Sequence, residues 1–173
     1  MTDTTLGSPE ALSGDPVALA RDLVRVPSVN PVLEEGGAGE AGIAELTASW
    51  LRDWGLETEV VEVEAGRPNV VAVSRSGEPG RTLLLNGHLD TVGVAGMSVA
   101  PFDGSVEGGR LVGRGACDMK AGLAAILATA RILARDGHAG TLTAALTAAE
   151  EPASLGMQAV VGSGVSADGA VVR

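Results

Sequence analysis

Three short polar clusters, each next to a strongly apolar segment, constrain the fold of this chain more than any other feature. NGHLD at residues 86–90 follows the apolar residues 83–85, GRGACDMK at 113–120 leads into an apolar helical pattern, and AAEEP at 148–152 follows an apolar strand pattern. Open α/β sheets carry their ligand sites beyond the carboxyl ends of the strands. The sequence therefore predicts the α/β class, with a mixed, mostly parallel sheet that is flanked by helices and carries a site at one edge.

Apolar periodicity predicts the remaining elements. Asp15 and Pro16 form a helix start signal. Apolar residues recur at helical spacing over residues 17–26, 43–54 and 119–135. Strand patterns cover residues 58–64, 69–74, 83–85, 141–147 and 170–172, and the run 83–85 is expected to be buried on both faces. We interpret Trp50 and Trp54 as core residues, residues 1–14 as a flexible tail, and residues 15–173 as one layered unit.

Charge and hydropathy exclude two classes of partner. The 173 residues contain 12 Lys and Arg against 22 Asp and Glu, which gives a formal net charge of −10, and Lys120 is the only lysine. Because binding to nucleic acid requires a basic surface, nucleic acid is not an expected partner. The longest run without a charged residue, between Glu151 and Asp168, is shorter than the roughly 20 residues that span a membrane. No membrane association is therefore expected.

Cys117 is the only cysteine, so the sequence excludes an intramolecular disulfide and favours a reducing compartment. The amino terminus also lacks the pattern of a secretory signal. We therefore expect a cytoplasmic protein. We interpret Cys117 as a small packed residue and His138, in a glycine-flanked segment, as an exposed turn residue away from the polar clusters.

The first cluster contains a histidine and an aspartate two residues apart. In an extended strand, His88 and Asp90 point to the same side. A carboxylate next to a histidine fixes its tautomer and raises its basicity, which is how many metal-bound imidazoles are oriented. Taken alone, however, the pair is better explained as a strand-end turn with a solvated aspartate.

The other two clusters contribute carboxylates. GRGACDMK is a poor phosphate loop, because Asp118 replaces the third glycine and would attract a cation at the helix start; alone, Asp118 is better read as a helix cap. Glu150 and Glu151 point in opposite directions, which suits one metal ligand and one base, although in isolation they fit a solvated loop. Because the three clusters occupy equivalent places on successive strand–helix units, a parallel arrangement would bring them together. The combination predicts a metal site.

The motifs NGHLDTV, GRGACDMKAG and AAEEPASLG, in this order and spacing, resemble those of the dinuclear zinc peptidases and amidohydrolases. This family includes acetylornithine deacetylase, succinyl-diaminopimelate desuccinylase, aminoacylase and carboxypeptidase G. The flanking helices and strands extend the resemblance over nearly the whole chain. It implies a zinc-exopeptidase-like catalytic domain, of which residues 15–173 form the amino-terminal part.

Carried over by position, the resemblance implies a role for each polar residue. His88 would bind one metal ion, and Asp90 would orient His88. Asp118 would bridge two metal ions, Glu151 would bind the second ion, and Glu150 would be the general base. The resemblance also implies a cis peptide bond after Asp118. Zinc is the expected metal, with two ions in a complete site, and cobalt or manganese also suits such ligands.

The reaction that the resemblance implies is hydrolysis of the amide bond of an N-acyl amino acid or small peptide, as in a deacetylase or carboxypeptidase. Two metal ions would activate a water molecule, and Glu150 would take its proton and return it to the leaving amine. The expected partner is therefore a small molecule, and a homodimer stays open for the full-length form.

The sequence lacks parts that the resemblance leads us to expect. An acidic ligand one strand later and a histidine near the carboxyl terminus are missing, as is the inserted lid and dimerisation domain; Arg173 stands at or just before the acidic ligand's place. We therefore expect little or no hydrolysis by the isolated chain. Two hypotheses remain: the amino-terminal part of an enzyme that is active in its complete form, or a truncated, non-catalytic remnant that binds metal weakly or acts as an interaction module.

Overall fold

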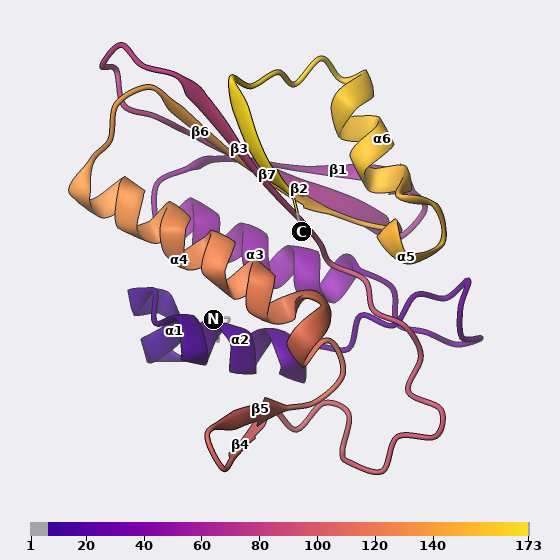
Figure 1. The fold of residues 1–173 in the computed structure, drawn as a ribbon. Coiled ribbons are helices and arrows are strands. Elements are labelled where there is room, and N and C mark those ends of the chain that lie inside the picture. The colour runs from indigo at the N-terminus through magenta and orange to yellow at the C-terminus, as the bar shows by residue number, and fades with distance from the viewer. Residues whose placement is uncertain (1–6, 173) are drawn as a thin grey trace, which may run out of the picture.

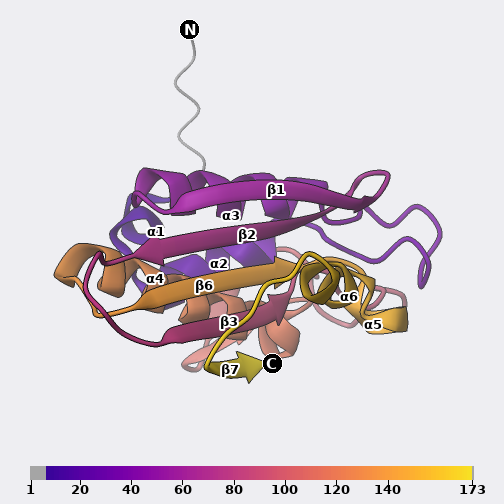
Figure 2. The ribbon, with the colours of Figure 1, turned by 90° about the horizontal axis from the view of Figure 1, so that it is seen from above.

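A five-stranded mixed sheet forms the centre of the computed structural model, which describes residues 7–172 (Figure 1). Its strands, in chain order, are β1 (Glu57–Glu64), β2 (Arg67–Arg75), β3 (Thr82–His88), β6 (Thr141–Thr147) and β7 (Gly169–Val172). In space the order is β1-β2-β6-β3-β7 (Figure 2). The pairs β6–β3 and β3–β7 are parallel, whereas β2 is antiparallel to both of its neighbours. Since β2 alone runs against the other four strands, the predicted mixed, mostly parallel sheet is confirmed.

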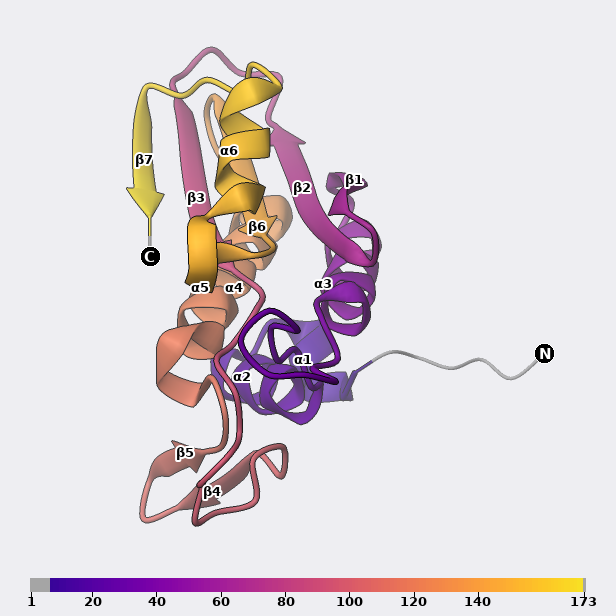
Figure 3. The same ribbon diagram turned by 90° about the vertical axis from the view of Figure 1, so that its right-hand side faces the viewer.

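Helices cover both faces of this sheet. On one face, α3 (Ala41–Asp53) lies on β1 and β2, and α4 (Ala121–Asp136) lies on β3 and β6. A further helix, α2 (Pro16–Arg25), packs against α4 and begins at the predicted start signal, where the Asp15 side chain accepts a hydrogen bond from the N–H of Ala18. On the opposite face, α6 (Leu155–Gly162) packs against β1 and β6 (Figure 3).

The main hydrophobic core lies between the sheet and the helices α2, α3 and α4. Leu123 and Leu127 of α4 are fully buried there, as the helical spacing predicts. Trp50 and Trp54 of α3 are also buried and stack on each other with ring centroids 6.4 Å apart, which confirms that they are core residues. A smaller core under α6 is formed by Leu84, Ala145 and Val160.

Part of the predicted flexible tail is a helix. Residues 1–6 of that segment lie outside the described part of the chain, but Pro9–Ser13 form α1, with Ala11 fully buried. The indole N–H of Trp54 donates to the carbonyl oxygen of Leu12 at 2.9 Å, so this helix is tied to α3. The prediction was wrong for α1 because five residues show too little periodicity, and a distant tryptophan supplies the docking contact.

Leu83 differs from expectation, and the glycine-rich segment after residue 91 contains two short strands. Leu83 is 38% exposed, because its partner on the edge strand β7 is Gly169, which has no side chain to cover it. The glycine-rich segment contains a hairpin of β4 (Ser105–Glu107) and β5 (Arg110–Val112), joined by two glycines with positive φ. Within residues 7–172, no helix is both long and apolar enough to cross a membrane.

Candidate metal centre

The parallel pair of β3 and β6 brings the polar clusters to one edge of the sheet. His88, the last residue of β3, lies opposite Thr147, the last residue of β6. Glu150 and Glu151 follow directly, at the start of the short helix α5 (Glu150–Ala153). Asp118 arrives from η1 (Ala116–Lys120), a single turn that leads into α4. Each predicted cluster therefore reaches the carboxyl end of the parallel strands.

The side chains converge around the imidazole of His88. Its Nε2 atom lies 3.0 Å from Oδ1 of Asp118 and 3.9 Å from Oε2 of Glu150. Ligand atoms of His88, Asp118 and Glu151 all lie within 4.8 Å of one another. An imidazole nitrogen and carboxylate oxygens in this arrangement form a donor set that suits zinc. The structure thus brings together the three residues predicted as metal ligands, with the predicted base Glu150 beside them; the role of each stays a prediction.

The candidate donors lie between the protein interior and solvent. The His88 side chain is buried, whereas the side chains of Asp118 and Glu150 are 76% and 42% exposed. Asp90 lies beneath them and is fully buried. An ion or a small molecule can therefore approach the candidate donors from solvent, whereas Asp90 beneath them belongs to the folded core.

Asp90 connects the first cluster to the third. Nδ1 of His88 lies 3.0 Å from the backbone oxygen of Asp90 and 3.6 Å from its carboxylate Oδ1. The carboxylate accepts hydrogen bonds from the N–H groups of Glu150 and Glu151 at 3.0 and 3.2 Å, and from the amide of Asn30 at 2.7 Å. Burial alone would raise the pKa of Asp90, but these donors and His88 outweigh it, and the pKa is lowered. Asp90 therefore holds the backbone of the two glutamates as well as the ring of His88.

The electrostatics of the group favour a bound cation. Burial would lower the pKa of His88, but hydrogen bonds and the charge of Asp90, together with Asp118, raise it to about 9. Burial, and the negative charges of Asp118, Asp90 and Glu150, raise the pKa of Glu151 against the opposing effect of His88. Without an ion, His88 therefore keeps a proton among the carboxylates. A metal ion would supply the positive charge instead.

Local features of η1 set the place of Asp118. Gly115 has a φ of 78°, and the peptide bond between Asp118 and Met119 is cis, as the family resemblance implies. Met119 is buried against β3, where a Cβ on Gly87 would lie 2.5 Å from its methyl group. Any side chain at position 87 would therefore displace the end of the Met119 side chain. Cys117 is exposed, so its expected packed position is wrong: the turn directs it outward.

Two residues near the ends of α4 have different roles. His138 lies at the other end of β6 from the donors, is half-buried, and shares a 2.8 Å hydrogen bond with Ser74; it is apart from the cluster, as expected, but less exposed. Lys120 is buried, and its Nζ donates to the carbonyl oxygen of Val26 at 2.8 Å. Burial lowers the pKa of Lys120 to about 7. Asn30 and Lys120 were missed because nothing local in the sequence signals their long-range partners.

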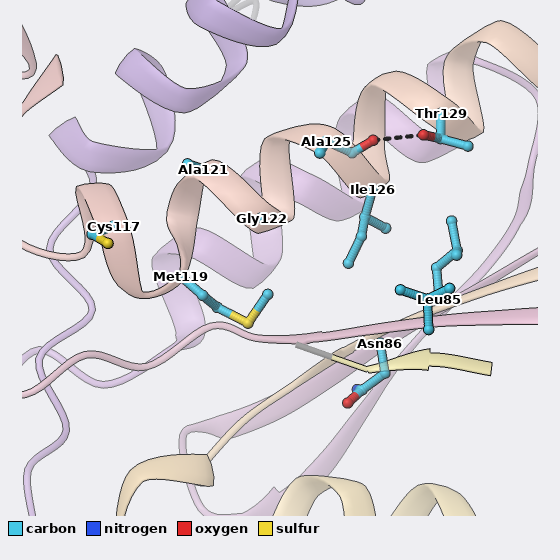
Figure 4. Close-up of a pocket in the computed structure, with 10 residues that line it drawn as sticks. Leu85, Asn86, Cys117, Met119, Ala121, Gly122, Ala125, Ile126 and Thr129 are labelled. Atoms are coloured by element: carbon cyan, nitrogen blue, oxygen red, sulfur yellow. Dashed lines mark hydrogen bonds between the residues drawn. The ribbon is translucent and has the colours of Figure 1, made fainter. Parts of the chain in front are cut away.

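Two hollows lie near the group. One, of about 260 Å³, is lined by Val92, residues 113–118 and Glu151, and so borders two of the candidate donors. A larger hollow of about 480 Å³ lies between α4 and the β3–β7 edge (Figure 4). Its wall is mostly apolar, with Leu85, Met119 and Ile126 directed into it. Because the candidate donors border the smaller hollow, we assign that one to the site.

The chain is similar to a known family of peptidases. Residues 84–172, slightly more than half of the chain, match the model of peptidase family M20/M25/M40. A succinyl-diaminopimelate desuccinylase of Parvibaculum lavamentivorans is 37% identical over 159 residues, which cover 88% of this chain and 38% of that protein. One from Gluconacetobacter diazotrophicus is 42% identical over 149 residues, covering 81% and 36%. The chain thus spans less than two fifths of the length of these relatives.

Solved structures share the fold. An M20 family metallo-carboxypeptidase from Sulfolobus solfataricus superimposes with a TM-score of 0.78 at 21% identity, over 91% of this chain and 37% of that one. A dinuclear metal-binding peptidase of the M20 family from Bacillus subtilis gives a TM-score of 0.61 at 21% identity, over 91% of this chain and 40% of that one. At this identity the match establishes the fold alone.

Proposed function

Since the chain belongs to peptidase family M20/M25/M40, a family of metal-dependent hydrolases, we propose that it supplies part of a two-metal amidohydrolase site. The observation that carries this proposal is the convergence of ligand atoms from His88, Asp118 and Glu151 within 4.8 Å. Glu150 lies beside them, with Oε2 at 3.9 Å from His88 Nε2. A metal ion bound there would balance the three exposed or half-buried carboxylates that gather around His88.

The residues present fit a divalent metal. Their donor set of one imidazole and two carboxylates suits zinc, and cobalt or manganese can use the same ligands. Burial and the neighbouring negative charges raise the pKa of Glu151, and a cation beside it would offset these charges. His88 and Asp118 would hold one ion, Asp118 and Glu151 the other. When bound, the metal ions lower the pKa of a water molecule and polarise the substrate carbonyl.

The protein side chains would then handle the proton. Glu150 is 42% exposed and faces the group from the start of α5, so its carboxylate can take a proton from the attacking water and give it to the leaving amine. Its Oε1 accepts a 3.3 Å hydrogen bond from the hydroxyl of Ser154. Asp90, fully buried, would hold both His88 and the backbone of Glu150 in place during this transfer.

The substrate class we propose is an N-acyl amino acid or a small peptide. Two relatives are named succinyl-diaminopimelate desuccinylase, and a structure with this fold is a metallo-carboxypeptidase. Because the chain spans less than two fifths of these relatives, we expect little hydrolysis from residues 1–173 alone. We also propose a cytoplasmic location, from the single cysteine, and leave a homodimer open for the complete protein.

Metal titration and an amidase assay test the proposal together. We expect the chain to bind Zn²⁺ or Co²⁺ by calorimetry, and His88→Ala to weaken binding at least about tenfold. In a longer protein that includes these residues, release of amine from N-succinyl and N-acetyl amino acids should require the metal, and Glu150→Gln should lower kcat by about 10²–10⁴. Unchanged metal binding by His88→Ala would overturn the site.

The same assay separates the two hypotheses for the isolated chain. Metal-dependent hydrolysis by residues 1–173 that Glu150→Gln abolishes would overturn our expectation that this chain is inactive alone. Metal binding without turnover, both alone and in the longer protein, would favour the alternative function as a non-catalytic metal-binding module.

A further inference from the structure

The turn that carries Glu150 and Glu151, residues 148–151, is held by side chains from distant segments. We call it the acidic turn. The N–H of Ala148 donates to Oδ1 of Asn69 at 2.9 Å, and the N–H of Ala149 donates to Oε1 of Glu40 at 2.9 Å. Asn69 and Glu40 are both buried. With the two N–H groups that Asp90 accepts, four consecutive backbone donors of the turn bind buried side chains.

The conformation of the acidic turn needs such support. Ala149 has φ 55° and ψ 41°, the left-handed region that side chains other than glycine rarely adopt. A residue in this region persists only where its surroundings hold it there. Since Ala149 is fully buried, solvent cannot take the place of its side-chain partner. The carbonyl oxygens of Ala148 and Ala149 accept backbone bonds from Gly156 and Leu155. The N–H groups of the turn depend on Asn69, Glu40 and Asp90, and these bonds contribute to the direction in which the two glutamates leave the sheet.

The partners of the acidic turn are themselves fixed. Glu40 precedes α3 and forms a two-point contact with Arg67, the first residue of β2: Nε to Oε2 at 2.9 Å, and a terminal nitrogen to Oε1. Both side chains are buried. Asn69 lies two residues further along β2 and uses its amide N–H₂ to donate to the carbonyl oxygen of Gly156 at 2.8 Å. The turn is therefore clamped between β2 and the start of α3.

We propose that Glu40 and Asn69 are positioning residues, which place the carboxylates of Glu150 and Glu151 for metal binding and proton transfer. Arg67 acts through Glu40 by holding its carboxylate in register. Neither oxygen of Glu40 is free for a metal ion, because Arg67 and the N–H of Ala149 already occupy them. The inference rests on the proposed metal centre for its consequence, but the clamp itself can be measured without metal.

Two variants and one control test the clamp. Asn69→Ala removes the acceptor of the Ala148 N–H, and Glu40→Gln removes the charge that pairs with Arg67 at nearly constant size. Leu19→Ala, in α2, is a control because Leu19 is fully buried in the main core and lies apart from the acidic turn. It reports what a general loss of stability does to the same measurements.

The first readout is amide hydrogen exchange by NMR on the metal-free chain. We expect the Ala148 and Ala149 amides to exchange at least about tenfold faster in Asn69→Ala and Glu40→Gln, while amides of α4 stay protected. In Leu19→Ala, any acceleration should be shared by all elements. Unchanged exchange at Ala148 and Ala149 in both variants would overturn the clamp.

The second readout is the affinity for Co²⁺, followed by its visible absorption. Both variants should bind Co²⁺ about 10–100-fold more weakly than the natural chain, and Leu19→Ala should bind it normally at a temperature where all chains are folded. If Glu40→Gln fails to fold, Asn69→Ala carries the test. Equal Co²⁺ affinity in natural and variant chains would overturn the positioning role, whereas a natural chain that binds no Co²⁺ would overturn the proposed metal centre and leave the exchange test intact.

Discussion

Two turns bring carboxylates to the same imidazole, and they differ in the contacts that hold their N–H groups. The acidic turn is buried at Ala148 and Ala149, and side chains up to 109 residues away hold its N–H groups. The turn at residues 113–120, which carries Asp118, is held mainly by local backbone bonds, such as the N–H of Lys120 to the carbonyl oxygen of Gly115 at 2.8 Å. The Asp118 side chain is 76% exposed.

This difference assigns different tasks to the two sides of the candidate centre. The acidic turn and Asp90 form a support that is continuous with the core. Asp118 contributes an exposed donor from a compact local turn, whose longest tether is the contact between Lys120 and Val26. Preorganised groups need no rearrangement during a reaction. The predicted general base, Glu150, lies in the acidic turn, the side that the core supports. The donor that admits an ion from solvent lies on the other.

The largest expected effect is the difference in stability between variants of two aspartates, the buried Asp90 and the exposed Asp118. Asp90→Ala should lower the free energy of unfolding by about 3–5 kcal/mol, because it leaves the buried amide of Asn30 and two part-buried backbone N–H groups without an acceptor, beside a charged His88. Asp118→Ala removes a carboxylate that is 76% exposed, and should change stability by less than about 1 kcal/mol.

Urea unfolding of the metal-free variants measures both values. Metal titration measures a separate property. Asp118→Ala should stay about as stable as the natural chain but lose metal affinity. If the two variants were equally stable, the division into a buried and an exposed side would be wrong.

The same division explains what could be predicted from the sequence. Asp118 and the two glutamates sit in short motifs directly after or before strongly apolar segments, so their approach to one sheet edge follows from strand direction alone. β6 was predicted with its observed ends, because seven apolar and threonine residues between glycine and a polar cluster leave little freedom.

What could not be predicted are contacts that depend on the folded chain. Glu40 and Asn69 lie far from the acidic turn in sequence. Glutamate and asparagine are also residue types that usually lie at the surface. Their burial follows only once β2 lies beside β6. Asp90 was predicted to orient His88, but its larger role, holding the backbone of both glutamates, depends on the same assembly.

A medium effect is expected where both turns contain a left-handed residue. Gly115→Ala should cost about 1–2 kcal/mol, since φ is 78° there and the new Cβ would lie 2.8 Å from the methyl group of Thr91. Ala149→Gly should change stability by less than about 1 kcal/mol, because relief of strain is offset by the greater freedom of glycine in the unfolded chain. Thermal unfolding of the pair measures this. A strongly destabilising Ala149→Gly would show that the methyl group, and not the clamp, fixes the acidic turn.

The smallest effect is expected at His138, the second histidine of the chain. It lies at the opposite end of β6 from the candidate donors, and its ring shares one 2.8 Å hydrogen bond with Ser74 at a half-buried position. His138→Ala should therefore cost about 0.5–1.5 kcal/mol of stability and leave Co²⁺ affinity unchanged, while His88→Ala should abolish the visible Co²⁺ spectrum. Because the two histidines differ in location and not in chemistry, a fall in Co²⁺ affinity in His138→Ala would mean that the metal binds outside the sheet edge where β3 and β6 end.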